Sequence, residues 1–239
     1  MSVSIPEAIA HLYEAADLPL PTTPHKQRIV LLNELLGAYN LTCTEIAGLT
    51  SLAASNFLLQ RGALFEPIKN ANQEPLAGYI YVSKKSGHIF VERNDLFVRR
   101  RFSVAHELGH YLLHFRPLIA LMRARDESEP FEISEALPVF AGNEDAEDTP
   151  AGRVFSPIQE EILSLLPPEA QMEDEANRFA AELLMPAEVV CDLVKRYTSV
   201  CRGDDLLWRL ATEMLVSKAA TYRRLKDLQL SAQVGVAWN

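Results

Sequence analysis

The first sixty residues carry hydrophobic positions at the spacing of helices. Apolar side chains recur every three or four residues over 6–17 and 26–39, and 44–59 continues in the same way despite a glycine at position 48. Short helices around a glycine turn are also typical of a helix-turn-helix, but the acidic flanks and the lack of a basic recognition helix favour plain helical packing. We therefore expect residues 1–60 to form an N-terminal helical region.

The period of the pattern then changes from that of helices to that of strands. Residues 78–82 and 88–92 are rich in β-branched and aromatic side chains, and the polar segment 83–87 between them is typical of a turn. These two runs predict an antiparallel hairpin. Residues 63–68 suggest a further strand, which the proline at position 67 weakens.

Residues 102–114 return to helical spacing and divide into two faces. One face is apolar, and the other carries His106, Glu107, His110 and His114. The two histidines of the His-Glu-x-x-His pattern lie one turn apart and can hold one zinc ion, and Glu107 is placed to take the proton of a water that the ion activates. A chance occurrence of the pattern would not be expected to separate an anchoring face from a ligand face.

The composition changes again between residues 125 and 170. This segment is acidic and contains six prolines. We expect an acidic insertion of largely irregular structure, with one short helix at 157–166. It could cover the site as a lid or dock a basic partner, and a solvated loop without a specific role is an equally open alternative.

The pattern of residues 171–186 predicts a strongly amphipathic helix. Its apolar stripe widens toward the side that carries Glu173 and Asn177, whereas Glu175 is expected to face away. Because burying an unpaired carboxylate is costly, an inward Glu173 calls for a cation, and zinc held by two histidines is such a cation. Asn177 could orient one of the metal ligands by a hydrogen bond without binding the ion itself.

Three further helices are expected at 188–197, 204–216 and 217–228, the last two resembling a helix-turn-helix unit. The last helix carries four basic residues, Lys218, Arg223, Arg224 and Lys226. They make DNA contact conceivable, but the apolar residues between them look like core positions, so ordinary packing is favoured.

Composition and charge narrow the classes of protein further. The chain has 239 residues and a net charge of -9, which argues against a whole-protein attraction to nucleic acid. Three widely spaced cysteines indicate reduced thiols rather than a disulfide framework. We see neither a signal peptide nor an apolar run long enough to cross a bilayer, so we expect a cytoplasmic protein without membrane contact.

Two motifs together resemble the ImmA/IrrE family of zinc metallopeptidases. They are Arg101-Phe-Ser-Val-Ala-His-Glu-Leu-Gly-His-Tyr-Leu-Leu-His and Glu173-x-x-Ala-Asn-x-Phe-Ala-Ala-Glu-Leu-Leu-Met-Pro, and a C-terminal Val216-Ser-x-x-Ala-x-x-x-Arg-Leu-x-x-Leu matches as well. The similarity covers roughly residues 60–230. It implies zinc on His106, His110 and Glu173, with Glu107 as the catalytic glutamate.

The resemblance also implies a biological setting. Several members act on DNA-binding repressors encoded beside them and so switch on mobile-element transfer or stress responses. This chain departs from the family in two respects: the segment between His110 and Glu173 is longer and more acidic than usual, and no N-terminal repressor-type helix-turn-helix is evident. We therefore expect transcription regulation through a separately encoded helix-turn-helix repressor.

The expected fold is α+β and mainly helical, with a small antiparallel sheet packed on the zinc-binding helix and a C-terminal helix-turn-helix-like bundle. We expect a metallopeptidase core of 61–124 and 171–190, interrupted by the insertion 125–170 and followed by a helical subdomain, 191–239. The expected function is zinc-dependent endopeptidase cleavage of a repressor protein. Alternatives are a non-proteolytic regulator that binds a repressor or DNA, with zinc structural or sensory, and a peptidase of small peptides.

Overall fold

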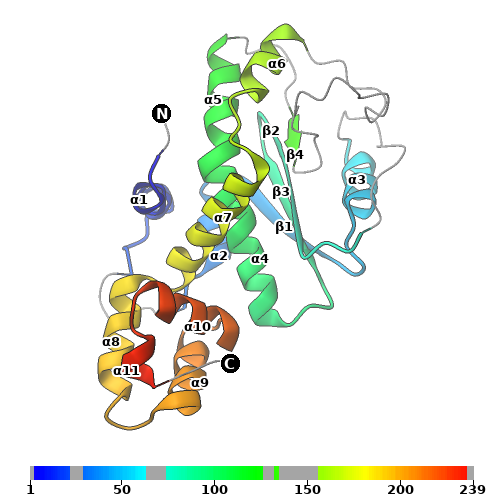
Figure 1. Ribbon diagram of the computed structural model, residues 1–239. Helices are drawn as coiled ribbons and strands as arrows, with labels where there is room; N and C mark the ends of the chain where they lie inside the picture. Colours follow the sequence, from blue (N-terminus) through cyan, green and yellow to red (C-terminus); the bar gives the residue numbers. More distant parts are fainter. Residues whose placement is uncertain (1–2, 22–28, 63–73, 126–131, 135–155, 236–239) are drawn as a thin grey trace.

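A small sheet with helices on both faces makes up the α+β fold that the sequence predicts (Figure 1). The structure is a computed structural model that describes residues 3–21, 29–62, 74–125, 132–134 and 156–235. The elements are α1 (Ile5–Ala15), α2 (Leu32–Gly37), β1 (Leu41–Ile46), α3 (Ser51–Gln60), β2 (Gly78–Ser83), β3 (Gly87–Glu92), α4 (Phe97–His110), a π-helical turn η1 (Tyr111–Phe115), α5 (Arg116–Arg125), β4 (Glu132–Ser134), α6 (Pro157–Leu163), α7 (Glu169–Leu184), α8 (Ala187–Tyr197), α9 (Gly203–Met214), α10 (Lys218–Asp227) and α11 (Ser231–Val234).

The sheet has four strands in the order β1-β3-β2-β4. The β2–β3 hairpin is antiparallel, as predicted, and β4 is antiparallel to β2. β1, however, runs parallel to β3, so the expectation of a purely antiparallel sheet is wrong. A parallel neighbour requires the chain to cross back before it pairs, and α3 lies in that connection between β1 and the hairpin.

The predicted helix at 44–59 is wrong in its first part. Residues 41–46 form β1, and a turn at Gly48, with φ of 69°, separates this strand from α3. The helix starts only after Thr50, whose Oγ1 accepts a hydrogen bond from the Ala53 amide at 3.1 Å. The helix expected at 26–39 is also shorter, since α2 covers only Leu32–Gly37. The expected strand at 63–68 lies outside the described residues.

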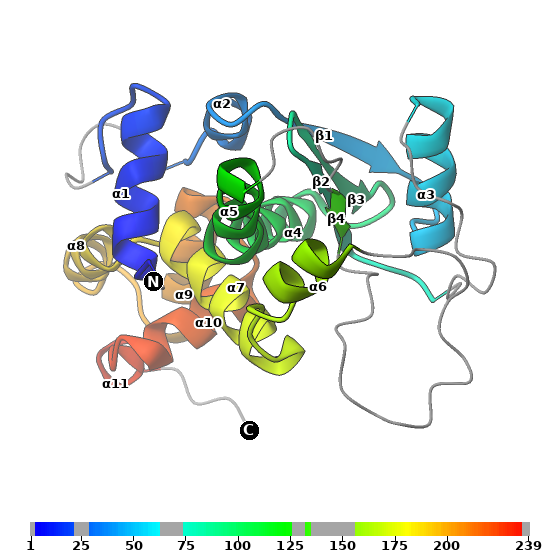
Figure 2. The ribbon, with the colours of Figure 1, turned by 90° about the horizontal axis from the view of Figure 1, so that it is seen from above.

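Both faces of the hairpin are covered, which explains its nearly continuous apolar sequence. Ile80 and Ile89 belong to the large core that contains α4, whereas Tyr79 and Phe90 pack in a smaller cluster beneath α3. Figure 2 shows α3 on one side of the sheet and α4 with α7 on the other. The sheet therefore forms a backing for the α4 helix.

One hydrophobic cluster runs from α1 through α4 and α7 to the C-terminal helices. It contains the apolar face of α4 that the sequence predicts, including Ala105 and Leu108. The division into 1–60, the interrupted core and 191–239 stays a prediction. None of the described helices is long and apolar enough to cross a membrane.

Parts of the acidic segment 125–170 are built into the fold. Ile133 of β4 is only 1% exposed and pairs with β2, and Ile162 of α6 is equally buried. The helix predicted at 157–166 is present as α6, where Ser156 and Gln159 form a capping box. The expectation of irregular structure is therefore wrong at β4, whereas the helix expected near the other end of the segment is confirmed.

The basic residues of α10 are not all available to a partner. The Arg224 side chain is buried, forms an ion pair with Glu182 of α7 and donates from Nε to the Met185 carbonyl at 3.0 Å. Lys218 forms an ion pair with Asp204 of α9. A DNA-contacting face on α10 would therefore rest on the exposed pair Arg223 and Lys226.

Candidate metal centre

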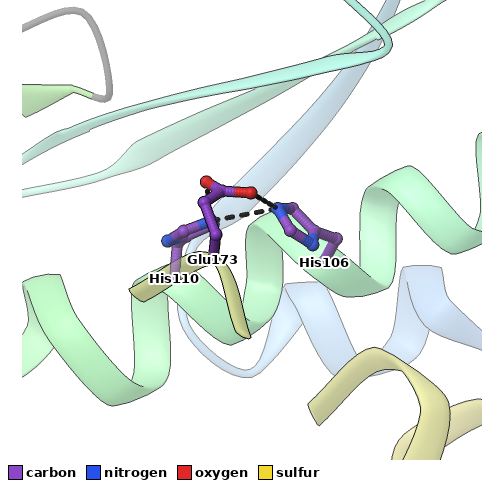
Figure 3. A group of neighbouring side chains, drawn as sticks. All are labelled: His106, His110 and Glu173. Carbon is purple, nitrogen blue, oxygen red and sulfur yellow. Dashed lines mark hydrogen bonds and ion pairs between the residues drawn. The ribbon is translucent and has the colours of Figure 1, made fainter. Parts of the chain in front are cut away.

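Three predicted ligands converge where α4 passes α7 (Figure 3). The Nε2 atoms of His106 and His110 lie 3.0 Å apart. Glu173 Oε2 is 3.4 Å from the first of these nitrogens, and Oε1 is 3.2 Å from the second. One ligand atom from each residue can be chosen so that all three lie within 4.8 Å of one another. The structure thus joins a local pair on one helix with a carboxylate more than sixty positions downstream.

Close packing of the two helices brings Glu173 to the histidines. A Cβ atom on Gly109 would lie 3.2 Å from the Cα of Ala176 and 3.1 Å from the Phe179 ring, so even alanine would press the helices apart. Ala176 is fully buried, and Glu173 lies about one turn before it on the same helix. Small residues at the crossing therefore set the distance between Glu173 and the histidines.

Glu173 reaches the site from the solvent side. Its side chain is 49% exposed, so the expectation that it points into the protein interior is wrong in part: it points at the histidines along the rim of the helix pair. Hydrogen bonds with His106 and His110 hold the pKa of its carboxyl well below the usual range. The carboxylate is therefore ionised at neutral pH and ready to bind a cation.

The donor set fits zinc. Tetrahedral zinc with bonds of about 2.0–2.2 Å holds its nitrogen and oxygen ligands about 3.3–3.6 Å apart. The two histidine nitrogens lie 3.0 Å apart, and each has a different Glu173 oxygen at 3.4 or 3.2 Å, so these distances are within a few tenths of an ångström of that separation. Two imidazoles and one carboxylate leave the fourth position of a tetrahedral ion for water or substrate, which is the pattern of catalytic rather than structural zinc sites.

Glu107 is held against the backbone of β2. Its side chain is buried, at 3% exposure, although it belongs to the ligand face of α4. A Cβ atom on Gly78 would lie 2.2 Å from Glu107 Oε1 and 3.1 Å from Cδ. Only a glycine at this position leaves room for the carboxylate where it lies. The sequence singled out Glu107 but contained no sign of the role of Gly78.

A chain of hydrogen bonds continues from His110 into η1. His114, only 3% exposed, places its Nδ1 3.3 Å from His110 Nδ1 and its Nε2 3.0 Å from Glu175 Oε2. Gln171 donates to the other Glu175 oxygen at 2.8 Å. The prediction that Glu175 faces away is therefore wrong. His114 and Glu175 are 61 positions apart, so no local pattern could have connected them.

Burial has the largest effect on the pKa of His114, whereas hydrogen bonds have the largest effect on the pKa of Glu175. Burial lowers the pKa of His114 and so favours its neutral form. The hydrogen bond from Gln171, and then that from His114, lower the pKa of Glu175 and keep it ionised. Asn177, expected to orient a ligand, instead donates to the Glu173 backbone carbonyl at 2.8 Å.

Comparison with protein-family models identifies the family of the chain. The family model of the IrrE N-terminal-like domain matches residues 67–133 and 162–226, more than half of the chain. The chain belongs to this family. The matched ranges contain all four predicted site residues, and the gap between them falls within the acidic segment.

Membership confirms the resemblance to the ImmA/IrrE family and supports a metallopeptidase-type activity. A search of curated proteins finds no match to the chain. For this IrrE N-terminal-like domain, the assignment of individual roles therefore rests on the geometry of its own residues.

Proposed function

We propose that the protein is a zinc-dependent metalloendopeptidase of the cytoplasm whose substrate is a separately encoded, DNA-binding helix-turn-helix repressor. The observation that carries the proposal is the convergence of His106, His110 and Glu173 beside the buried Glu107. Membership of the family supports the peptidase class. The resemblance of the chain to family members that act on neighbouring repressors supports the proposed substrate.

Each residue has a defined task in the proposed hydrolysis. His106, His110 and Glu173 would hold the ion, which when bound supplies a Lewis acid that activates water and polarises the peptide carbonyl. Glu107, adjacent to the ligands on α4, accepts the proton of the attacking water and returns it to the leaving amine. The two histidine ligands and the base thus share the helix α4, which fixes their relative positions, while Glu173 comes from α7.

The sheet offers a place for the substrate backbone. β4 pairs only with Tyr81, Val82 and Ser83, and no described strand lies beside the first half of β2 on that side. An extended peptide could add to this edge as a further strand, next to Gly78 and Glu107. Such a position would bring a substrate carbonyl to the site without a preformed pocket.

The proposal is tested by incubating the zinc-loaded protein with the product of the neighbouring repressor gene and measuring intact masses. The wild type should cleave, whereas Glu107→Gln should retain zinc and lose about 10²–10⁴-fold in rate, because only the proton acceptor is removed. Turnover at the wild-type rate in Glu107→Gln would refute the mechanism.

The same experiment separates the main alternative, a non-proteolytic regulator. In that case wild type and Glu107→Gln would bind the repressor equally well and neither would cleave it. Cleavage of short peptides with an intact repressor would instead point to a small-peptide peptidase.

A further inference from the structure

We propose that His114 and Glu175 form a positioning pair that fixes the tautomer and the ring orientation of the metal ligand His110. The inference rests on the proposed metal site and goes beyond it by assigning a task to two residues outside the ligand set. Neither residue would touch the ion or the substrate.

The direction of the hydrogen bonds follows from the ionised end of the chain. Glu175 is a carboxylate that can only accept, so the nitrogen that faces it at 3.0 Å, His114 Nε2, must carry a proton. A neutral imidazole carries one proton, so His114 Nδ1 is then an acceptor. His110 Nδ1, 3.3 Å away, must in turn be the donor.

This order leaves His110 in the form that a metal needs. With its proton on Nδ1, His110 keeps the lone pair of Nε2 for the ion, on the side where His106 Nε2 and the Glu173 carboxylate lie. A bound ion would take the place of the proton that otherwise joins His110 Nε2 to Glu173. The reverse order would protonate His110 Nε2 and set the bare Nε2 lone pair of His114 against the Glu175 carboxylate. Burial of His114 disfavours the doubly protonated alternative, because a buried charge is costly.

The local backbone supports the arrangement. η1 is a π-helical turn that begins directly after His110, and the Arg116 amide donates to the Tyr111 carbonyl within it. Single π-helical turns inside α-helices frequently occur at functional sites. From the other helix, Gln171 holds Glu175 in place through the 2.8 Å bond to Oε1. His114 is thus positioned by the π-helical turn η1, and Glu175 is positioned by Gln171 of the same helix, α7.

The test measures zinc affinity by competition with a chromophoric chelator, so it does not depend on catalysis. Glu175→Gln removes the charge that orders the chain and should weaken zinc binding roughly 10–100-fold, the usual cost of a lost outer-shell partner. Asp174→Asn is the matched control, because it removes the same charge from the neighbouring, solvent-exposed position. It should leave the affinity unchanged.

Two substitutions of His114 separate positioning from packing. His114→Leu removes the acceptor for His110 and should weaken zinc binding as Glu175→Gln does. His114→Asn keeps an oxygen near the position of Nδ1 and should restore part of the affinity. If His114→Leu fails to fold, the variant at the partly exposed Glu175 still decides the question.

The tautomer itself provides an independent readout. Long-range proton–nitrogen spectra of histidine-labelled, zinc-loaded protein should show His114 protonated on Nε2 in the wild type and a mixture of His114 tautomers in Glu175→Gln. Wild-type zinc affinity and an unchanged His114 tautomer in Glu175→Gln would overturn the inference.

The outcomes also separate this inference from the proposed function. Zinc binding that survives His106→Ala would contradict the proposed metal site, and the proposed role of the positioning pair would fail with it. If the Glu175 variant weakens zinc binding but the wild type cleaves nothing, the positioning pair stands and the peptidase proposal fails.

Discussion

Replacing Gly78 by alanine should disable the site without removing the metal. The glycine belongs to β2, and the space where its Cβ would lie is occupied by the Glu107 carboxylate, with Oε1 at 2.2 Å and Cγ at 3.2 Å. An ordinary contact requires about 3.4 Å, so Oε1 must move by about 1 Å. Because the side chain is flexible at its end, we expect it to move rather than the strand.

The displacement sets the size of the effect. Misplacing a reacting group by about 1 Å can cost about 10²-fold in rate. Full loss of a general base costs about 10²–10⁴-fold. Gly78→Ala should therefore lower kcat/KM by about 10²-fold. Zinc affinity should not change, because Glu107 is not among the ligands.

The assay uses a fluorogenic peptide that spans the repressor cleavage site, together with zinc content and thermal unfolding of each variant. Gly37→Ala is the control, since a Cβ on Gly37 meets nothing within 4 Å. Wild-type activity in Gly78→Ala, at full zinc content, would show that the position of Glu107 against β2 has no part in the reaction.

Three further predictions concern the ligand set and the frame around it. Glu173→Ala should weaken zinc binding by more than about 10²-fold in the chelator assay, because a ligand and its charge are lost; an unchanged affinity would mean that another group completes the site. Arg224→Ala should lower the free energy of unfolding by about 1.5–3 kcal/mol in urea, since it removes the charged partner of the α7 carboxylate and carbonyl; equal stability would show that the ion pair contributes nothing. Replacing 136–154 by a Gly-Ser linker should leave zinc binding and unfolding unchanged, whereas deleting 128–166 should destabilise the protein because it removes the buried Ile133; equal effects of the two deletions would contradict the assignment of β4 to the fold.

The described ends of the acidic segment are attached to the sheet and to α5. Its first end, β4, occupies the C-terminal half of the β2 edge, and its other end, α6, packs on α5, where Arg125 and Glu161 form an ion pair at 2.6 Å. The segment is therefore anchored on both sides of the stretch that the family model leaves unmatched. The sequence leaves a lid, a docking element and a solvated loop as alternatives, and the activity of the linker variant tests the first.

Local patterns in the sequence were sufficient for the elements that carry the ligands. The spacing of His106 and His110 and the apolar stripe behind them are short-range properties of one helix, so they predicted the ligand face of α4 correctly. The β2–β3 hairpin and the α7 helix were predicted for the same reason. In each case the residues that determine the structure are close neighbours in the chain.

Tertiary structure alone decided the contacts that complete the site. The second half of β1, 44–46, was predicted as the start of a helix because its apolar spacing is ambiguous, and its strand conformation depends on pairing with β3, about 45 positions away. Glu175 lies at the edge of the apolar face of α7. Its role depends on the residue of the neighbouring element that it meets, which is His114. The space for Glu107 likewise depends on a glycine in β2. A side chain at the edge of a helix face has no defined partner until the neighbouring element is in place, because helical periodicity sets its direction and only packing sets what it meets.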